Sequence, residues 1–314
     1  MLPVDRLRVA VVGPGAVGGL LGALLARAGH SVAFVAHGES LAVLRAAGVT
    51  VTSPEGTFAT GPLEASPEPR DLGERDAVFV CVKAWQVEAI APSLKPLVGS
   101  KTIVAPMQNG VEAAGHLSRA LGEEPVVGSF CRVLAAREAP GRVQTLGTPL
   151  ELVLGERTGG VSPRIERLGA AARAAGIVVK LSDDIAAALW SKLLFVEPLG
   201  SVGAVTRATV DVVRSLPETR ALLEGAMREV QAVAGGRGVH LPDDAVARAL
   251  ARVDAMPLGS TASMHRDIVE GRPSELNEQT GAVVRAGKET GVARPIHDFL
   301  WASLVPQEAR LRRR

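Results

Sequence analysis

Short apolar runs alternate with longer segments of helical spacing at the start of the chain. Residues 7–12 (LRVAVV) form a continuous apolar, β-branched run bounded by glycine, which is typical of a parallel strand buried on both faces. Apolar residues then recur at helical spacing over 16–28, and Gly29 is expected to end that helix. A second strand is predicted at 31–36 (SVAFVA), so the three segments form a β-turn-α-β unit with a right-handed crossover.

The alternation of strands and helices continues to about residue 106 and predicts an α/β fold with a doubly wound, Rossmann-like sheet. We expect a helix at about 39–47, short strands near 49–60, a strand at 77–82, a helix near 85–97 and a strand at 102–106. From about 125 to 155 the pattern becomes rich in strands with glycine turns. These strands are expected to add to the first sheet in antiparallel fashion.

The last third of the chain has a different pattern. A helix near 162–175 and a strand IVVKL at 177–181 are expected to close the first domain. After Ser182-Asp183-Asp184, which is a helix N-cap signal, strand signals nearly vanish and helical patterns rich in alanine and leucine follow. We therefore predict a Rossmann domain over 1–182 and a mainly helical domain over 183–314, and two unlike domains commonly bind a ligand where they meet.

Composition narrows the class of partner. The chain has 35 Lys and Arg against 33 Asp and Glu, a net charge of +2 that is too balanced to indicate nucleic acid or an acidic membrane. No run reaches roughly 18 uninterrupted apolar residues, so no membrane span is expected. The charged N-terminal segment 1–12 is unlike a signal peptide. A small-molecule partner is the expectation that remains.

The cysteines and histidines indicate the redox compartment and whether a metal is bound. Cys81 and Cys131 each lie inside an apolar run, which favours buried reduced thiols and therefore a cytoplasmic location. The six histidines have no close metal-ligand spacing, so no metal is expected.

A glycine-rich turn joins the first predicted strand to the first predicted helix. The segment Gly13-Pro14-Gly15-Ala16-Val17-Gly18 reads G-x-G-x-x-G, the pattern of dinucleotide-binding turns. The first glycine permits the tight turn, the second lets a pyrophosphate approach the backbone, and the third allows close packing of helix on strand. The alternative is a glycine-rich turn with no ligand, although the placement between strand and helix favours a cofactor site.

The end of the second predicted strand informs on the choice of cofactor. NAD enzymes usually place an acid there, about 20 residues after the glycines, to bind the ribose hydroxyls. Here Ala36 and His37 occupy the tip, and the first acid is Glu39. A 2′-phosphate is tolerated better by this tip than by a carboxylate, so NADP (NADPH) is favoured, with His37 either a phosphate partner or an ordinary surface histidine.

Five motifs in order give the chain a family resemblance over nearly its whole length. They are GPGAVGG near the N-terminus, Val82-Lys83-Ala84-Trp85-Gln86, Gln108-Asn109-Gly110, Trp190-Ser191-Lys192-Leu193, and STASMHRDIVEGRPSE from Ser260 to Glu275. With these motifs the sequence resembles the ketopantoate reductase (2-dehydropantoate 2-reductase) family. The resemblance implies NADPH-dependent reduction of 2-dehydropantoate to pantoate, a step towards coenzyme A.

The resemblance also implies catalytic residues. Lys192 matches the general acid of the family, which protonates the keto oxygen as hydride arrives. Glu275 matches the glutamate that orients this lysine and binds the substrate hydroxyl. From the residues alone, two alternatives remain open: Lys192 could be an ordinary lysine on a helix surface, and Glu275 could be a solvated acid without a catalytic role.

Three further residues match binding positions of the family. Ser263 corresponds to a serine that binds the substrate carboxylate, and Asn109 to an asparagine at the nicotinamide end of the cofactor and near the substrate. Lys83 corresponds to a lysine that lies towards the adenosine phosphate of the cofactor or the mouth of the cleft. A helix cap for Ser263 and a plain Asn-Gly turn for Asn109 remain open. Ser263 and Glu275 are 12 residues apart, and Gly271 with Pro273 is expected to interrupt any helix between them.

The chain departs from the family pattern at three positions. Val196 and Gly200 stand where the family usually has asparagines, and His37 stands where it usually has arginine. A related reductase of another keto acid therefore remains an alternative, as does a non-catalytic dinucleotide sensor, although a sensor needs no proton donor such as Lys192. The sequence leaves open whether the chain acts alone or as a homodimer.

Overall fold

The computed structural model describes Arg6–Leu311; the rest of the charged N-terminal segment and Arg312–Arg314 lie outside the described residues. The chain divides into two compact units. The first contains the described residues up to Gln108 together with Ala113–Ile185, and the second contains Asn109–Glu112 with the chain from Ala186 onward. Nothing in the sequence pattern predicts that the short segment Asn109–Glu112 belongs to the second unit.

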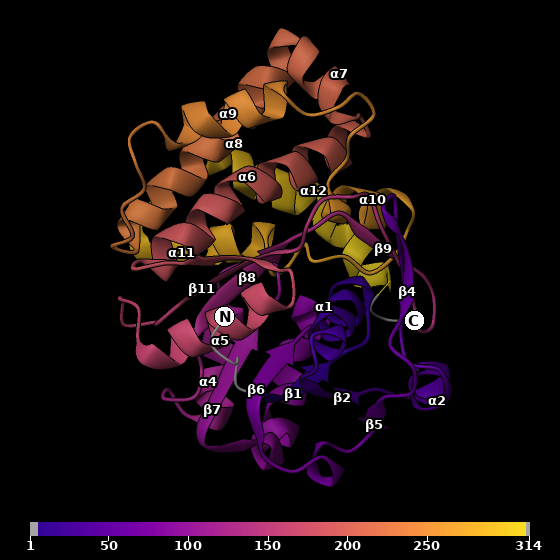
Figure 1. The fold of residues 1–314 in the computed structure, drawn as a ribbon. Coiled ribbons are helices and arrows are strands. Elements are labelled where there is room, and N and C mark those ends of the chain that lie inside the picture. Colours follow the sequence, from indigo (N-terminus) through magenta and orange to yellow (C-terminus); the bar gives the residue numbers. More distant parts are fainter. Residues whose placement is uncertain (1–5, 312–314) are drawn as a thin grey trace. The chain divides into compact units, whose positions relative to one another are not determined.

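A parallel sheet of five strands forms the centre of the first unit (Figure 1). Its order is β5-β2-β1-β6-β7, with every neighbouring pair parallel, as expected for a doubly wound sheet. The chain fills the β2 side of β1 first and the β6 side afterwards, so the order reverses beside β1, where such sheets bind ligands. The strands are β1 (Arg8–Val12), β2 (Ser31–Val35), β5 (Glu64–Ser66), β6 (Arg75–Val80) and β7 (Val98–Pro106).

The helices of the first unit include the predicted ones, together with η1 and α4, which were not predicted. They are α1 (Ala16–Arg27), α2 (Gly38–Ala46), η1 (Pro69–Asp71), η2 (Ala84–Gln86), α3 (Val87–Ile90), η3 (Ala91–Leu97), α4 (Ala113–Leu121) and α5 (Pro163–Ala174). The helix expected near 85–97 is divided into one short α-helix and two 3-10 segments. Pro92 and Pro96 account for this, because proline has no N–H to continue an α-helical ladder.

The strand-rich region does not extend the first sheet, so the expectation of antiparallel additions was wrong. Its strands join β3, β4 and β12 in two further sheets, ordered β4-β3-β10-β9 and β12-β11-β8. Within the described part of the chain, one isolated parallel bridge pairs Val104 of the first sheet with Val126. A strand pattern shows which face is buried but not which strand is the neighbour. The strands are β3 (Thr50–Ser53), β4 (Gly56–Ala59), β8 (Gly128–Arg132), β9 (Ala135–Ala139), β10 (Arg142–Thr145), β11 (Glu151–Gly155) and β12 (Val178–Leu181).

The second unit is helical, coloured from red-orange to yellow in Figure 1. Its core is built from side chains such as Leu193, Met227, Val283 and Leu300, all less than 2% exposed. The helices are α6 (Ile185–Thr206), α7 (Val210–Ser215), α8 (Pro217–Gly236), α9 (Ala245–Asp254), α10 (Ser263–Val269), α11 (Thr280–Thr290) and α12 (Pro295–Leu311).

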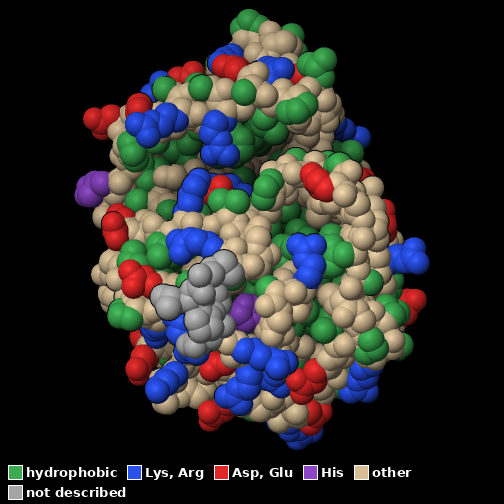
Figure 2. All heavy atoms as spheres, viewed as in Figure 1, with side chains coloured by type: hydrophobic (Ala, Val, Ile, Leu, Met, Phe, Trp, Pro, Cys, Tyr) green, Lys and Arg blue, Asp and Glu red, His purple; other side chains and the backbone are tan. Residues whose placement is uncertain are grey.

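Helix α6 is the central element of this core. Among the described residues it is the one helix whose length of 22 residues and apolar composition would suffice to cross a membrane, and 61% of its apolar window is buried inside the protein. Burial in a protein core accounts for that composition without a bilayer. Side chains of both charge signs are interspersed on the face shown in Figure 2, in keeping with the balanced composition.

Neither cysteine forms a disulfide bond, in keeping with the expected reduced thiols. Cys131 is buried and Cys81 is partly buried.

Candidate active site

The glycine-rich turn follows β1 at the point where the strand order reverses. Gly13 has φ +98°, and a Cβ there would lie 2.9 Å from Cγ1 of Val82. A Cβ on Gly18 would lie 2.1 Å from the carbonyl oxygen of Gly13. Gly15 differs, because nothing lies within 4 Å of the position its Cβ would take. The fold therefore requires Gly13 and Gly18, whereas Gly15 faces open space that a ligand can enter.

The N-terminus of α1 is arranged for an anion. Gly15 is the N-cap and has no side chain to accept from the first N–H groups, and the first turn carries no acid. Together, the exposed N–H groups and the positive end of the helix dipole attract negative charge. This arrangement fits the pyrophosphate of a dinucleotide, held by backbone N–H groups of the Gly13-Pro14-Gly15-Ala16-Val17-Gly18 turn.

His37 and Lys83 follow the carboxyl ends of the two strands that flank β1. His37 is exposed and directly precedes α2, and Lys83 is exposed beyond β6, with its ammonium 5.6 Å from the centre of the Trp85 ring. Both residues therefore lie on the sheet edge that carries the glycine turn.

Gln108 was not selected from the sequence, although it belongs to a recognised motif. Its side-chain amide donates to the carbonyl oxygens of Val80 at 2.7 Å and Val82 at 2.8 Å, and the side chain is buried. The amide thereby joins the end of β7 to the end of β6. Because Val82 also packs against Gly13, Gln108 stabilises the backbone behind the glycine turn.

Lys192 on α6 and Glu275 in the turn before α11 are both buried charged side chains of the second unit. Only 7% of Lys192 and 8% of Glu275 are exposed. Charged groups are seldom buried to this extent unless they are paired or hydrogen-bonded. Neither residue is the surface lysine or solvated acid that the sequence left open.

Glu275 accepts two hydrogen bonds at one carboxylate oxygen. Asn109 Nδ2 donates to Glu275 Oε2 at 3.1 Å, and Gln279 Nε2 donates to the same atom at 3.2 Å. The Gln279 side chain is 1% exposed and was not predicted. These contacts fix the orientation of the carboxylate and bring two residues expected at the site, Asn109 and Glu275, into direct contact.

The loop that presents Glu275 is anchored to the C-terminal helix. The predicted interruption after Ser263 is confirmed, because α10 ends at Val269 and Gly271 has φ +68°. Beyond it, the backbone N–H of Ser274 donates to the Glu308 carboxylate, and the Ser274 hydroxyl donates to Glu308 Oε2 at 2.7 Å. Ser274 is 0% exposed and Glu308 6%. A buried acid on α12 thus holds the residue next to Glu275.

Ser263 is the exposed first residue of α10, and the N-cap is Ala262, so Ser263 is not the cap that the sequence left open. Next to it, Met264 fills the space beside Gly200, where a Cβ would lie 2.7 Å from Met264 Cε and 3.2 Å from its Cβ. An asparagine at 200 would require the Met264 side chain to move. Val196, one turn earlier, is partly buried.

A buried acid-histidine-acid group crosses the helical core and was not predicted. His297 Nε2 lies 2.9 Å from Glu197 Oε2, and His297 Nδ1 lies 2.7 Å from Glu229 Oε2. Burial alone would lower the pKa of His297, but the two carboxylates outweigh it and raise this pKa to about 9. Thr280 donates to Glu197 Oε1 at 2.7 Å, which joins the group to the start of α11. Within Arg6–Leu311 no cluster of three or more His, Cys, Asp or Glu side chains could hold a metal ion.

Both units of the chain match models of known protein families. A family described as ketopantoate reductase PanE/ApbA matches residues 9–159, and its C-terminal counterpart matches residues 184–308. The chain belongs to the ketopantoate reductase family. As a member of this family it is an NADP-dependent oxidoreductase.

Individual relatives agree with the family. A 2-dehydropantoate 2-reductase of Mycobacterium tuberculosis is 32% identical over 293 residues, which cover 93% of this chain and 95% of that protein. The crystal structure of a 2-dehydropantoate 2-reductase from Geobacter metallireducens matches with a TM-score of 0.89 and 31% identity, covering 96% and 99% of the two chains. A D-mandelate dehydrogenase solved with NADH and anilino(oxo)acetate matches with a TM-score of 0.87 at 20% identity, which shows a shared fold.

Proposed function

We propose that the protein reduces 2-dehydropantoate (ketopantoate) to pantoate with NADPH, in the cytoplasm, as a step of pantothenate and coenzyme A biosynthesis. The observation that carries the proposal is the buried Glu275 carboxylate, which is held by Asn109 and Gln279 in the same helical unit that buries Lys192. The family assignment and relatives named 2-dehydropantoate 2-reductase support this substrate.

In the proposed mechanism Lys192 is the general acid. NADPH, when bound, would supply the hydride that adds to the keto carbon, and negative charge would then develop on the keto oxygen. The Lys192 ammonium stabilises this charge and transfers a proton to the oxygen, which yields the hydroxyl of the product. Burial of Lys192 favours this role, because an ammonium shielded from water interacts more strongly with developing charge.

Glu275 is proposed to keep Lys192 oriented and to accept a hydrogen bond from the substrate hydroxyl. The hydrogen bonds from Asn109 and Gln279 both reach Oε2 and hold the carboxylate in one orientation. Ser263, exposed at the start of α10, is proposed to bind the substrate carboxylate. Asn109 is proposed to contact both the nicotinamide end of the cofactor and the substrate.

The proposed cofactor site is the carboxyl edge of the parallel sheet. The Gly13-Pro14-Gly15-Ala16-Val17-Gly18 turn would hold the pyrophosphate at the N-terminus of α1. His37, the exposed residue after β2, would lie towards the 2′-phosphate, and Lys83 would lie towards the same cofactor. NADPH is proposed over NADH because no carboxylate occupies the tip of β2.

Turnover tests the proposal directly. The purified protein should oxidise NADPH with ketopantoate more efficiently than with a panel of other 2-keto and 3-keto acids. Preferred reduction of a different keto acid would reject the substrate and retain the reaction class. NADPH binding with no turnover of any keto acid would reject the catalytic proposal.

A further inference from the structure

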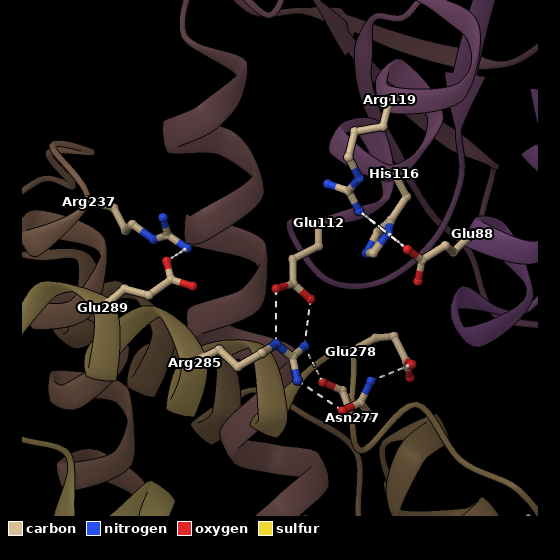
Figure 3. Close-up of polar contacts among 9 residues, drawn as sticks. All are labelled: Glu88, Glu112, His116, Arg119, Arg237, Asn277, Glu278, Arg285 and Glu289. Carbon is tan, nitrogen blue, oxygen red and sulfur yellow. Dashed lines mark hydrogen bonds and ion pairs between the residues drawn. The ribbon is translucent and has the colours of Figure 1, made fainter.

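We propose that Arg285 is a positioning residue that latches the segment Asn109–Glu112 to the loop of Glu275, and so sets the contact between Asn109 and Glu275. This inference rests on the proposed role of Glu275. Arg285 lies on α11, away from the residues matched to the family motifs. Figure 3 shows its guanidinium between Glu112 on one side and Asn277 on the other.

The Arg285 guanidinium binds both segments at once. Towards the first, Nε donates to Glu112 Oε1 at 3.3 Å and Nη2 donates to Glu112 Oε2 at 2.6 Å. Towards the second, Nη1 donates to Asn277 Oδ1 at 2.9 Å and Nη2 donates to the Asn277 carbonyl oxygen at 2.8 Å. Four donations from one planar group require an arginine, because a lysine ammonium cannot reproduce this fork.

The two segments that Arg285 joins are the ones that meet at Glu275. Asn109 lies three residues before Glu112 and donates to Glu275 Oε2 at 3.1 Å. Glu275 lies two residues before Asn277. The segments also touch at Gly110, where a Cβ would lie 2.6 Å from the carbonyl oxygen of Glu278, one residue beyond Asn277. The latch and the Asn109–Glu275 hydrogen bond are thus two contacts along one pair of short segments.

Residues next to Arg285 leave room for its guanidinium and hold the segment Asn109–Glu112. Gly281, on the preceding turn of α11, has no side chain, and a Cβ there would lie 3.0 Å from Arg285 Nη1 and 3.2 Å from Asn277 Oδ1. Glycine at this position lets the guanidinium lie close to its own helix. Val111 packs against the helical core, so the segment is held by an apolar contact in its middle and by a charged one at its end.

The helix that carries Arg285 also supplies a matched control pair. Arg237 Nη2 lies 2.6 Å from Glu289 Oε2, and Glu289 is one turn beyond Arg285 on α11 (Figure 3). Exposure is comparable, with 39% for Arg285 and 41% for Arg237. If the loss of a surface ion pair lowers stability in general, both substitutions should lower it by a similar amount.

The test compares Arg285→Lys with Arg237→Lys in the full-length protein. Arg285→Lys should lower kcat/KM for the keto acid by roughly 10- to 100-fold, the size expected when a reacting group is misplaced by about 1 Å. NADPH affinity should stay within about threefold, because the glycine turn belongs to the other unit. Arg237→Lys should leave kcat/KM unchanged. Equal kcat/KM in the two variants would overturn the proposal.

A double-mutant cycle locates the effect. In an Asn109→Ala background, Arg285→Lys should lower kcat/KM by less than about threefold more, because the contact that it positions is already absent. If the fold-loss of kcat/KM in the double variant equals the product of the fold-losses in the two single variants, Arg285 does not act through Asn109. That result would contradict the latch.

Hydrogen exchange separates failure of the latch from failure of the proposed function. In Arg285→Lys the backbone amides over residues 109–112 should exchange faster than in wild type, and in Arg237→Lys they should not. This readout needs no turnover, so it holds even if Glu275→Gln proves fully active and the catalytic role of Glu275 falls. Unchanged exchange over 109–112 in Arg285→Lys would refute the latch.

Discussion

Asn109 Nδ2 donates a 3.1 Å hydrogen bond to Glu275 Oε2, although 166 residues separate the two in the chain. This bond and the donation from Gln279 both reach the same oxygen of a carboxylate that is 8% exposed. Removal of one donor from a buried charged acceptor leaves that acceptor less well satisfied, so the orientation of Glu275 depends on both amides.

Asn109→Ala should therefore lower kcat/KM for the keto acid by roughly 10- to 100-fold, since a carboxylate held by one amide is oriented less tightly. The melting temperature should change little, since Gln279 still donates to Glu275. Steady-state kinetics with thermal unfolding checks both values. If kcat/KM stays at the wild-type value, the Asn109–Glu275 contact has no catalytic role.

The three glycines of the turn should separate into structural and binding positions. Gly18→Ala should lower protein stability, because its Cβ would lie 2.1 Å from the Gly13 carbonyl oxygen. Gly15→Ala meets nothing within 4 Å and should fold normally, yet weaken NADPH binding by filling the approach to the pyrophosphate. Thermal unfolding and fluorescence titration of both variants test this division. A Gly15→Ala protein that binds NADPH as wild type does would place the cofactor elsewhere.

His297 should make stability depend on pH. Its pKa is raised to about 9 by Glu197 and Glu229 against the effect of burial, whereas an unfolded histidine has a pKa of about 6.5. A raised folded-state pKa gives stabilisation that is complete below about pH 6.5 and is lost as the pH rises through 9. The free energy of unfolding of the wild-type protein should accordingly fall between pH 6.5 and 9.

Two histidine variants test whether His297 causes this pH dependence. His297→Gln should cost about 3–5 kcal/mol at pH 6.5, because Glu197 would remain buried without its charged partner, and the loss between pH 6.5 and 9 should shrink. His240 is exposed in the same unit, and His240→Gln should keep the wild-type profile. Urea titration at each pH provides the measurement. An unchanged profile in His297→Gln would mean that another group causes the pH dependence.

Cofactor preference should depend on the tip of β2. NADPH should bind more tightly than NADH, because Ala36 and His37 present no carboxylate to the 2′-phosphate. If His37 contacts the phosphate, a His37→Arg variant should keep the preference for NADPH. Fluorescence titration of both dinucleotides is the measurement, and equal or tighter binding of NADH would contradict the prediction.

Local patterns in the sequence predicted the elements and the turn that the fold requires. The apolar run of β1, the glycine turn and the helical spacing of α1 follow from contacts within about 30 residues, and the structure has them where expected. Pairing was harder: the strand pattern of β8 to β11 could not show that these strands leave the first sheet. A strand pattern records burial but not the neighbour.

The same limit applies to the site. Motif matching selected Lys192, Glu275 and Asn109, but the bond between Asn109 and Glu275 joins distant segments, and no local pattern encodes it. Arg285, Gln279 and Glu308 contact the loop of Glu275 through side chains whose spacing resembles that of ordinary surface or core helix residues. Only the folded chain shows which segments these side chains join.

The role of Lys192 is the central claim, and steady-state kinetics on Lys192→Ala tests it most directly. Lys288 is an exposed lysine in the same unit, so Lys288→Ala is the control for loss of a positive charge. Lys192→Ala should lower kcat by roughly 10²- to 10⁴-fold, with NADPH affinity within about threefold of wild type and an unchanged circular dichroism spectrum. Lys288→Ala should retain wild-type kcat. A folded Lys192→Ala protein with near-wild-type kcat would show that Lys192 is not the proton donor and that the proposed mechanism is wrong.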